Sequence, residues 1–217
     1  MADLIFYTNP MSRGQTIRWM LEEIGQPYDT EILDFGSTLK QEPYLSINPM
    51  GKVPAIKHRG KVVTEVAAIC CYLADAFPEA GLAPDPKDRA DYYRWIFFTS
   101  GPVEAAFSNK SAGWEPASDK QAMFGYGTYE RAIATLEGAL RGKTYIASDR
   151  FTAADLFVGA MVNFMLQFKL LDPTPVFTDY VARVTDRNAY RRAKDIDGKL
   201  IAEMQAKQQP QSQQQPA

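Results

Sequence analysis

Apolar residues mark a strand, a turn and a helix at the start of the chain. Leu4 to Tyr7 form an apolar and aromatic run typical of a strand, and Asn9-Pro10 is a turn signal that ends it. From Ser12 to Ile24 the apolar residues recur at helical spacing, and Gly25 and Pro27 end the helix. The chain therefore opens with the order strand, turn, helix.

Further strands and a second helix are predicted before the middle of the chain. Residues 27–35, PYDTEILDF, alternate loosely and predict a second strand. Residues 55–58 and 61–63 are typical of two short strands joined by a tight turn. Thr64 is expected to cap the helix that follows. We therefore predict a domain of the α/β class over residues 1–79, in the order β-α-β, β-β-α.

Only helical periods follow in the rest of the chain. The segment PEAGLAPDPKDRA is rich in proline, glycine and charge, so we assign residues 80–87 to a linker and residues 88–205 to an all-α domain. The expected helices cover residues 92–107, 120–140, 152–168, 176–184 and 189–204. Residues 206–217 are mostly glutamine and proline, which predicts a disordered tail.

Composition excludes several classes of function. The formal net charge is −2, from 24 basic and 26 acidic residues, so no nucleic-acid partner is expected. No signal peptide is recognised and no apolar run approaches the roughly 20 residues of a membrane span, so we expect no membrane association. Cys70 and Cys71 are adjacent in a predicted helix, which favours neither a disulfide framework nor a metal site and fits a reducing, cytoplasmic setting. His58 is the single histidine, which argues against a metal centre and a Ser-His-Asp hydrolase.

Ser12 has two interpretations. With Gln15 it fits a capping box, in which the hydroxyl accepts a backbone N–H of the first turn and Gln15 reaches back. Local sequence alone favours this capping role. A helix N-terminus also carries partial positive charge and unpaired N–H groups, which favour an anion beside Ser12. The two interpretations do not exclude each other.

The segment YLSINPMGKVPAI suggests a binding loop. Val53-Pro54 directly precedes a predicted strand and is a candidate for the minority cis X-Pro bond, which turns the preceding backbone N–H and C=O outward. A peptide-like ligand could pair with that backbone like an added strand. The alternative is that Val53-Pro54 only forms a turn.

Four segments together resemble a cytosolic glutathione S-transferase of the bacterial, serine type. They are NPMSRG after the first strand, NPMGKVPAI, TEVAAICCYLADAFP and SDRFTAADLFVGAMV, and their order along the chain is that of the family. The resemblance implies a thioredoxin-like N-terminal domain, an all-helical C-terminal domain, a homodimer, glutathione as co-substrate and no metal.

The resemblance also implies roles for single residues. Ser12 is the catalytic residue that holds the glutathione sulfur, and Asn9 lies roughly where tyrosine-type members have their tyrosine. The other glutathione-binding positions are Lys40 and Lys52 for the glycyl carboxylate, Val53 beside Pro54 for the peptide backbone, Glu65 for the γ-glutamyl amine and Val66 for the γ-glutamyl carboxylate. Val66 departs from the family, which usually has a serine there, so one hydrogen bond to glutathione is expected to be missing.

The second substrate is expected to be electrophilic and largely apolar. The resemblance and the aromatic positions of the helices point to a pocket lined by Met11, Phe107, Trp114 and Tyr126, although such aromatic residues are more often core. The resulting hypothesis is a transferase that adds the glutathione thiolate to that substrate. The alternative is a non-catalytic protein on the same fold that binds glutathione or a hydrophobic ligand, which Val66 favours slightly.

A capping box is predicted at the start of the helix over residues 152–168. Thr152 and Asp155 have the required spacing, and Phe151 with Leu156 can form a hydrophobic staple. We assign this motif to folding and not to catalysis.

Overall fold

A four-stranded sheet organises the first of two units in the computed structural model, which describes residues 2–208. Within that range the strands follow the order β2-β1-β3-β4. They are β1 Leu4–Thr8, β2 Asp29–Ile32, β3 Ala55–His58 and β4 Lys61–Thr64. Strand β1 pairs in parallel with β2 and antiparallel with β3, and β3 pairs antiparallel with β4. Together with the helices described in the next paragraphs, this strand arrangement confirms the predicted thioredoxin-like class.

Each face of this sheet is covered by different segments. The pleat places Phe6 and Ile56 on one face, where both are buried. Helix α1, Gly14–Ile24, covers that face, since the guanidinium of Arg18 lies 4.9 Å from the centre of the Phe6 ring. On the other face Tyr7 packs on Tyr44, with ring centres 5.7 Å apart. Tyr44 belongs to one of two 3₁₀ turns on that face, η1 Thr38–Lys40 and η2 Tyr44–Ser46.

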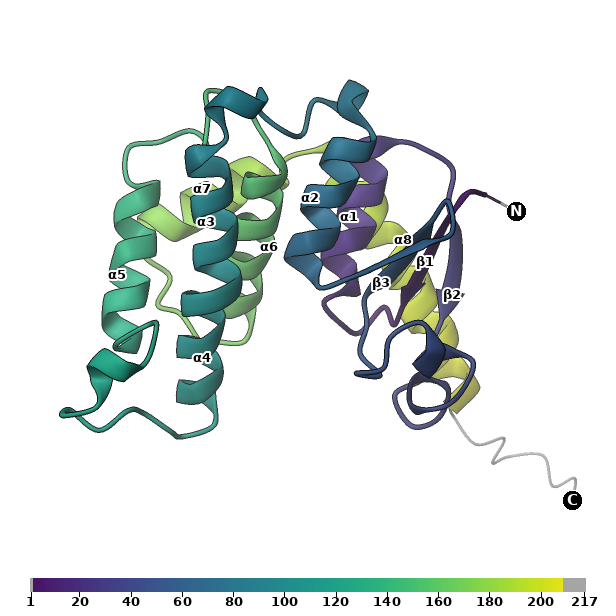
Figure 1. Ribbon diagram of the computed structural model, residues 1–217, viewed down its shortest axis with the longest axis horizontal. Coiled ribbons are helices and arrows are strands. Elements are labelled where there is room, and N and C mark those ends of the chain that lie inside the picture. The colour runs from purple at the N-terminus through teal and green to yellow at the C-terminus, as the bar shows by residue number, and fades with distance from the viewer. Residues whose placement is uncertain (1, 209–217) are drawn as a thin grey trace, which may run out of the picture. The chain divides into compact units, whose positions relative to one another are not determined.

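The last helix belongs to the first unit. Helix α8, Asn188–Gln208, packs along α1, and the two lie side by side in Figure 1, α1 purple and α8 yellow. Trp19 and Tyr190 meet edge to face, with ring centres 4.9 Å apart. The first unit thus combines residues up to Thr64 with those from Asn188 onward, whereas the sequence places the last helix in the all-α domain. Helix α8 also includes residues 206–208 of the predicted tail, and the rest of that tail lies outside the described residues.

The second unit, Glu65–Arg187, is helical throughout its regular structure. Its α-helices are α2 Val66–Ala76, α3 Ala90–Phe98, α4 Glu104–Ser111, α5 Tyr129–Leu140, α6 Ala153–Gln167 and α7 Pro175–Thr185. None of the helices within residues 2–208 combines the length and the apolar run that crossing a bilayer requires.

Two predicted helix starts and one predicted continuous helix are wrong for local reasons. Strand β4 continues to Thr64, so Glu65 and not Thr64 precedes α2. The helix expected over residues 92–107 contains a π-helical turn, Thr99–Val103, around Pro102, which has no N–H to donate. The helix expected from residue 120 starts only at Tyr129. Gly127 adopts a positive φ of 66°, and the Thr128 hydroxyl accepts the N–H of Arg131, which sets the new start.

The capping box of α6 is confirmed and is wholly buried. The Asp155 carboxylate accepts the Thr152 N–H at 3.0 Å and the Ile146 N–H at 2.8 Å. It also accepts the Tyr180 hydroxyl at 2.9 Å. Burial raises the pKa of Asp155, and the hydrogen bonds from Ile146 and Thr152 oppose that shift. One carboxylate thereby joins the start of α6, the segment before it and α7.

Replacing Asp155 by alanine should destabilise the protein strongly. We expect Asp155→Ala to lower the free energy of unfolding by at least about 3 kcal/mol, because several buried donors lose their acceptor at about 1 to 3 kcal/mol each. That loss corresponds to a fall in melting temperature of about 6 to 12 °C, measured by calorimetry. Asp155→Asn, which keeps one acceptor oxygen, should lose less. Asp119→Ala at an exposed position should change little, and equal effects of the variants at 155 and 119 would refute the assignment.

Candidate functional site

The sheet register brings the two predicted binding loops to one end of the sheet. Tyr7 pairs with Ala55, so the end of β1 and the start of β3 lie side by side in an antiparallel pair. Ser12 comes four residues after the last residue of β1, and Val53 comes two residues before the first residue of β3. The NPMSRG and NPMGKVPAI segments therefore lie at the same end of the two central strands.

A tight turn holds Ser12 before α1. The carbonyl oxygen of Asn9 accepts both the N–H of Ser12, at 3.1 Å, and its hydroxyl, at 2.6 Å. The Ser12 Oγ in turn accepts the N–H of Gly14 at 2.9 Å. The Ser12 hydroxyl thus accepts an N–H of the first turn, as predicted, but Gln15 does not reach back to Ser12. The Ser12 N–H donates to Asn9 instead, and the Gln15 amide donates to the carbonyl of Pro10 at 2.7 Å. Ser12 is half-buried, so its hydroxyl is held in place yet reachable.

Asn9 shapes this turn from a buried position. Its Oδ1 accepts the N–H of Met11 at 2.9 Å, and its Nδ2 donates to the carbonyl of Leu33 at 2.7 Å. The first bond closes an Asx turn, and the second fixes the turn to the segment that follows β2. Asn9 is 1% exposed, so the geometry gives its side chain a positioning role for Ser12.

Gly14 permits the close approach of α1 to β1. A Cβ atom at this position would lie 1.9 Å from the Oγ1 of Thr8 and 3.0 Å from the Oγ of Ser12. The Thr8 side chain is buried, so it has no free space to move into. The sequence contained one signal for this role, the glycine two residues after Ser12, but it did not reveal the contact with Thr8.

The loop before β3 presents an open backbone edge. The Val53-Pro54 bond is cis, as predicted, and a second cis bond, Glu42-Pro43, was not predicted. The carbonyl of Lys52 accepts the Tyr44 hydroxyl and the Asn48 Nδ2, which fixes the loop. Within the described residues, neither the N–H nor the C=O of Val53 makes a hydrogen bond. Val53 therefore offers both groups to an extended ligand.

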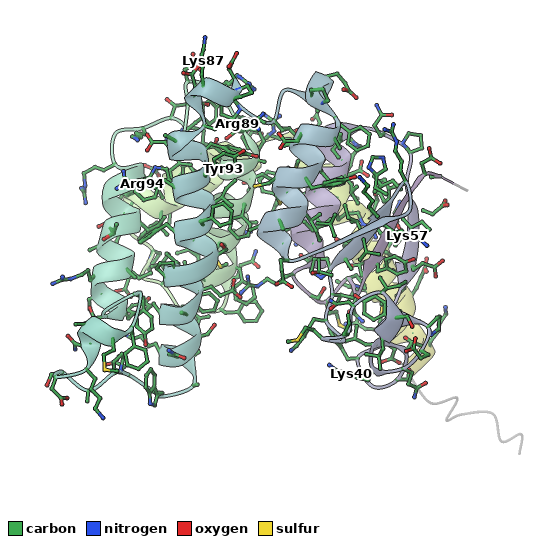
Figure 2. The ribbon with its side chains drawn as sticks, in the orientation of Figure 1. Lys40, Lys57, Lys87, Arg89, Tyr93 and Arg94 are labelled. Carbon is green, nitrogen blue, oxygen red and sulfur yellow. The ribbon has the colours of Figure 1, made fainter. Side chains whose placement is uncertain are left out.

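The two predicted lysines differ in their surroundings. The Lys40 Nζ donates to the carbonyls of Gly51, at 2.7 Å, and Met50, at 3.3 Å, so two of its three donors hold the loop. Figure 2 labels Lys40 in this part of the molecule. Lys52 is exposed, and its ammonium has no hydrogen bond or ion pair among the described residues. Lys52 is therefore the freer cation for a carboxylate.

The start of α2 lies in the second unit and has an uncommon backbone. Glu65 precedes the helix with a φ of 66°, a conformation that non-glycine residues seldom adopt. Its carbonyl accepts the N–H of Ile69 at 2.9 Å, and no side chain caps the helix. The first N–H groups of α2 are consequently open to an anion, and Val66 adds no hydroxyl to them.

The four predicted pocket residues are divided between exposed and core positions. Met11 is exposed beside Ser12 in the first unit. In the second unit Trp114 is exposed and meets Phe124 edge to face at 5.2 Å. Phe107 and Tyr126 are buried, and the Tyr126 oxygen accepts the Asn109 Nδ2 at 2.9 Å. Phe107 and Tyr126 thus belong to the helical core of that unit.

Comparisons with known proteins agree on one family. Two family models match, the N-terminal domain of glutathione S-transferase over residues 11–76 and its C-terminal domain over residues 109–188. Glutathione S-transferase 1 of Schizosaccharomyces pombe is 29% identical over 157 residues, which are 67% of this chain and 68% of that protein.

Solved structures give the same result. A glutathione transferase from Methylococcus capsulatus superposes with a TM-score of 0.74 at 27% identity, covering 90% of this chain and 98% of the other. A glutathione transferase homologue from Sulfitobacter with bound glutathione has a TM-score of 0.73 at 25% identity, with coverage of 90% and 99%.

The contact at Gly14 predicts a specific pattern of stability. Gly14→Ala should lower the free energy of unfolding by about 1 to 3 kcal/mol, because the new methyl group overlaps the Thr8 hydroxyl. Adding Thr8→Ala should recover part of the loss. Gly138→Ala in α5, where no atom lies within 4 Å, should instead gain about 0.5 to 1 kcal/mol. Urea unfolding measures all of these, and equal effects at positions 14 and 138 would contradict the steric account.

Proposed function

Because the chain belongs to the glutathione S-transferase family, we propose that it binds glutathione and transfers its thiolate to an electrophilic, largely apolar second substrate. The observation that carries this proposal is the Ser12 hydroxyl at the start of α1, at the same end of the sheet as the unpaired backbone of Val53. The Ser12 hydroxyl can donate to a sulfur anion, and the Val53 backbone can pair with a peptide.

Each functional group of glutathione has a candidate partner. The peptide backbone would pair with Val53 beside Pro54, and the glycyl carboxylate would meet the free ammonium of Lys52, with the remaining donor of Lys40 as a second cation. At the start of α2, Glu65 offers a carboxylate for the γ-glutamyl amine. The uncapped N–H groups at Val66 and the next residues suit the γ-glutamyl carboxylate.

The Ser12 hydroxyl can donate only one hydrogen bond, so it can stabilise a thiolate only if the sulfur is the acceptor of that bond. In the structure the hydroxyl donates to the neutral carbonyl of Asn9. A hydrogen bond to a charged acceptor contributes about 1.5 to 3 kcal/mol, against about 0.5 to 1.5 kcal/mol for a neutral one, so a bound thiolate can take that donor over from Asn9. The N–H of Gly14 stays on the Ser12 Oγ and polarises the hydroxyl further.

This exchange lowers the pKa of the bound thiol. A free thiol has a pKa of about 8.5, and each unit of pKa corresponds to about 1.36 kcal/mol. One hydroxyl donor, together with about 0.3 to 1 kcal/mol from the N-terminus of α1, lowers that pKa by about one to two units. The thiolate then becomes the major species near neutral pH. Its sulfur lone pair forms the S–C bond with the electrophile, whose leaving group departs or whose double bond takes up a proton from water.

A second candidate is a protein that binds glutathione without turning over a second substrate. Val66 favours it, because a valine at the start of α2 leaves the γ-glutamyl carboxylate with backbone donors alone. Retention on immobilised glutathione, with no product from chloronitrobenzenes, organic halides or unsaturated carbonyl compounds, would support this candidate over the transferase.

The decisive variant is Ser12→Ala. We expect turnover to fall by about ten- to a thousandfold while glutathione still binds, and the ultraviolet absorbance of the bound thiolate near neutral pH to decrease. Ser12→Thr should keep part of both signals. Calorimetry should show a small stability loss of about 1 kcal/mol from the lost turn contacts.

Ser148→Ala is the matched control for that experiment. The Ser148 Oγ also donates to a backbone carbonyl, that of Arg150, and accepts the Arg150 N–H, so the same pair of bonds is lost in another segment. It should leave turnover and thiolate absorbance unchanged. If Ser12→Ala also kept both, Ser12 would only hold the turn and another donor would have to bind the sulfur.

We further propose that the protein is a two-fold homodimer. Tyr93 and Phe97, one turn apart on α3, expose 39% and 59% of their surfaces, with ring centres 6.3 Å apart. Figure 2 shows Tyr93 on α3 between the labelled Arg89 and Arg94. An exposed aromatic pair with flanking arginines has the composition of an interface centre, and a two-fold axis would bring two such pairs together.

Sedimentation tests the dimer. We expect about twice the chain mass of 24.3 kDa at micromolar concentration, because covering the aromatic pair removes apolar surface from water. Phe97→Glu should shift the equilibrium towards the monomer by bringing two carboxylates together. The equally exposed Phe168→Glu should leave the mass unchanged. A wild-type monomer would contradict the proposal.

A further inference from the structure

We propose that Gln15 and Lys194 are positioning residues for the proposed thiolate chemistry, acting through the turn that carries Ser12. This inference rests on the proposed function, since it concerns how the Ser12 hydroxyl is held for a sulfur anion. It assigns a role in the site to α8, which starts more than 170 positions after Ser12.

Two hydrogen bonds link α8 to the turn. The ammonium of Lys194 donates to the Gln15 Oε1 at 3.1 Å, and the Gln15 Nε2 donates to the carbonyl oxygen of Pro10 at 2.7 Å. Pro10 lies inside the turn, between Asn9, whose carbonyl accepts the Ser12 hydroxyl, and Ser12 itself. Two hydrogen bonds thus connect the Lys194 side chain on α8 to the Pro10 carbonyl in the turn that holds Ser12.

Lys194 decides which way the Gln15 amide faces. A lysine ammonium can only donate, so it selects the amide oxygen of Gln15 and leaves the NH₂ group pointing at Pro10. If the amide were flipped, its oxygen would face the Pro10 carbonyl oxygen, and two acceptors would oppose each other. The charge on α8 therefore favours the one orientation in which the Gln15 amide donates to the Pro10 carbonyl and holds the turn.

The position of Lys194 is fixed by neighbouring contacts of the same helix. The Arg18 Nε donates to the buried carboxylate of Asp197 at 3.2 Å. The Arg192 side chain donates to the Glu22 carboxylate at 2.9 Å and to the Glu22 carbonyl at 2.8 Å. Lys194 lies between these two anchors in the sequence, so its own exposed hydrogen bond does not have to hold the helix.

The positive charge of the Lys194 ammonium also favours a thiolate at this turn and so also lowers the pKa of the bound thiol. It adds positive charge beside the first turn of α1, where the helix already favours an anion. Because Lys194 is exposed, water screens this effect, and we expect it to be smaller than that of losing the Gln15 bond to Pro10.

Variants of Gln15 and Lys194 separate these contributions. Gln15→Met removes the link to Pro10 without changing charge. Gln15→Glu keeps an acceptor for Lys194 but has no donor for Pro10. Lys194→Met removes the ammonium, and Lys194→Arg restores a donor. Lys199→Met removes the same charge from another position on α8 and serves as the control.

The main readout is the pKa of the bound glutathione thiol, followed by thiolate absorbance against pH, together with kcat, KM and melting temperature. We expect Gln15→Met to raise that pKa by about half a unit and to lower kcat about threefold with little change in KM. Gln15→Glu should raise the pKa by about one unit because it adds a negative charge. Lys194→Met should show a smaller rise, and Lys194→Arg and Lys199→Met should match the wild type.

A double variant tests whether the two residues act as one relay, meaning that Lys194 acts on the turn through the hydrogen bonds from Lys194 to Gln15 and from Gln15 to Pro10. If Lys194 acts mainly through Gln15, Gln15→Met with Lys194→Met should shift the thiol pKa little more than Gln15→Met alone. Fully additive shifts would overturn the relay. So would a fall in melting temperature with an unchanged thiol pKa, because that is the signature of a purely structural contact.

The relay and the proposed function can fail separately. If Ser12→Ala lowers the thiolate signal while the Gln15 and Lys194 variants behave like the Lys199 control, the relay is wrong and the proposed function stands. If wild-type protein shows no thiolate signal with glutathione at all, the proposed function is wrong.

Discussion

The buried guanidinium of Arg18 is the constraint on which the first unit depends. It donates to Asp197 on α8, to Thr30 on β2 and to the hydroxyl of Tyr28, and it is 1% exposed. A buried charge is costly unless it is paired and hydrogen-bonded, so the bonds of its Nε and Nη1 favour the one arrangement of α1, α8 and β2 in which these bonds form. The Arg18 Nη2 is buried without a hydrogen-bond partner among the described residues. Burial raises the pKa of Asp197, and the charge and hydrogen bond of Arg18 oppose that shift.

Fixing α1 in this way fixes the Ser12 turn at its start. The same helix brings Gly14 against Thr8 and Gln15 against Pro10, and neither contact tolerates a shift of α1 along the sheet. Buried Asn9 holds the other side of the turn through Leu33. The Ser12 hydroxyl is consequently held by backbone groups that are themselves anchored from two directions. Such a group loses little freedom when it donates to an anion, which is the advantage of a preorganised site.

The sequence predicted those features that depend on neighbouring residues. The Asn9-Pro10 turn, the cis Val53-Pro54 bond and the Thr152–Asp155 capping box each have a local signature, and all three are present. The pairing of Arg18 with Asp197 joins residues 179 positions apart, and no local pattern encodes it. Gln15 shows the limit most clearly, since its spacing from Ser12 satisfied the capping-box rule. The Pro10 carbonyl and a lysine on α8 form its actual hydrogen bonds.

The start of α2 has the opposite character, since nothing in its sequence stabilises it locally. Glu65 has a positive φ, which costs about 1 to 3 kcal/mol for a non-glycine residue, and no side chain caps the helix. A serine, threonine or aspartate before the helix would have satisfied its first N–H groups but would also have occupied them. Val66 has no polar side-chain atom, so it adds no donor to those backbone groups. A carboxylate bound there would supply the missing cap, so ligand binding would also stabilise the helix. The recognition would come from backbone N–H groups, which side-chain substitutions alter least.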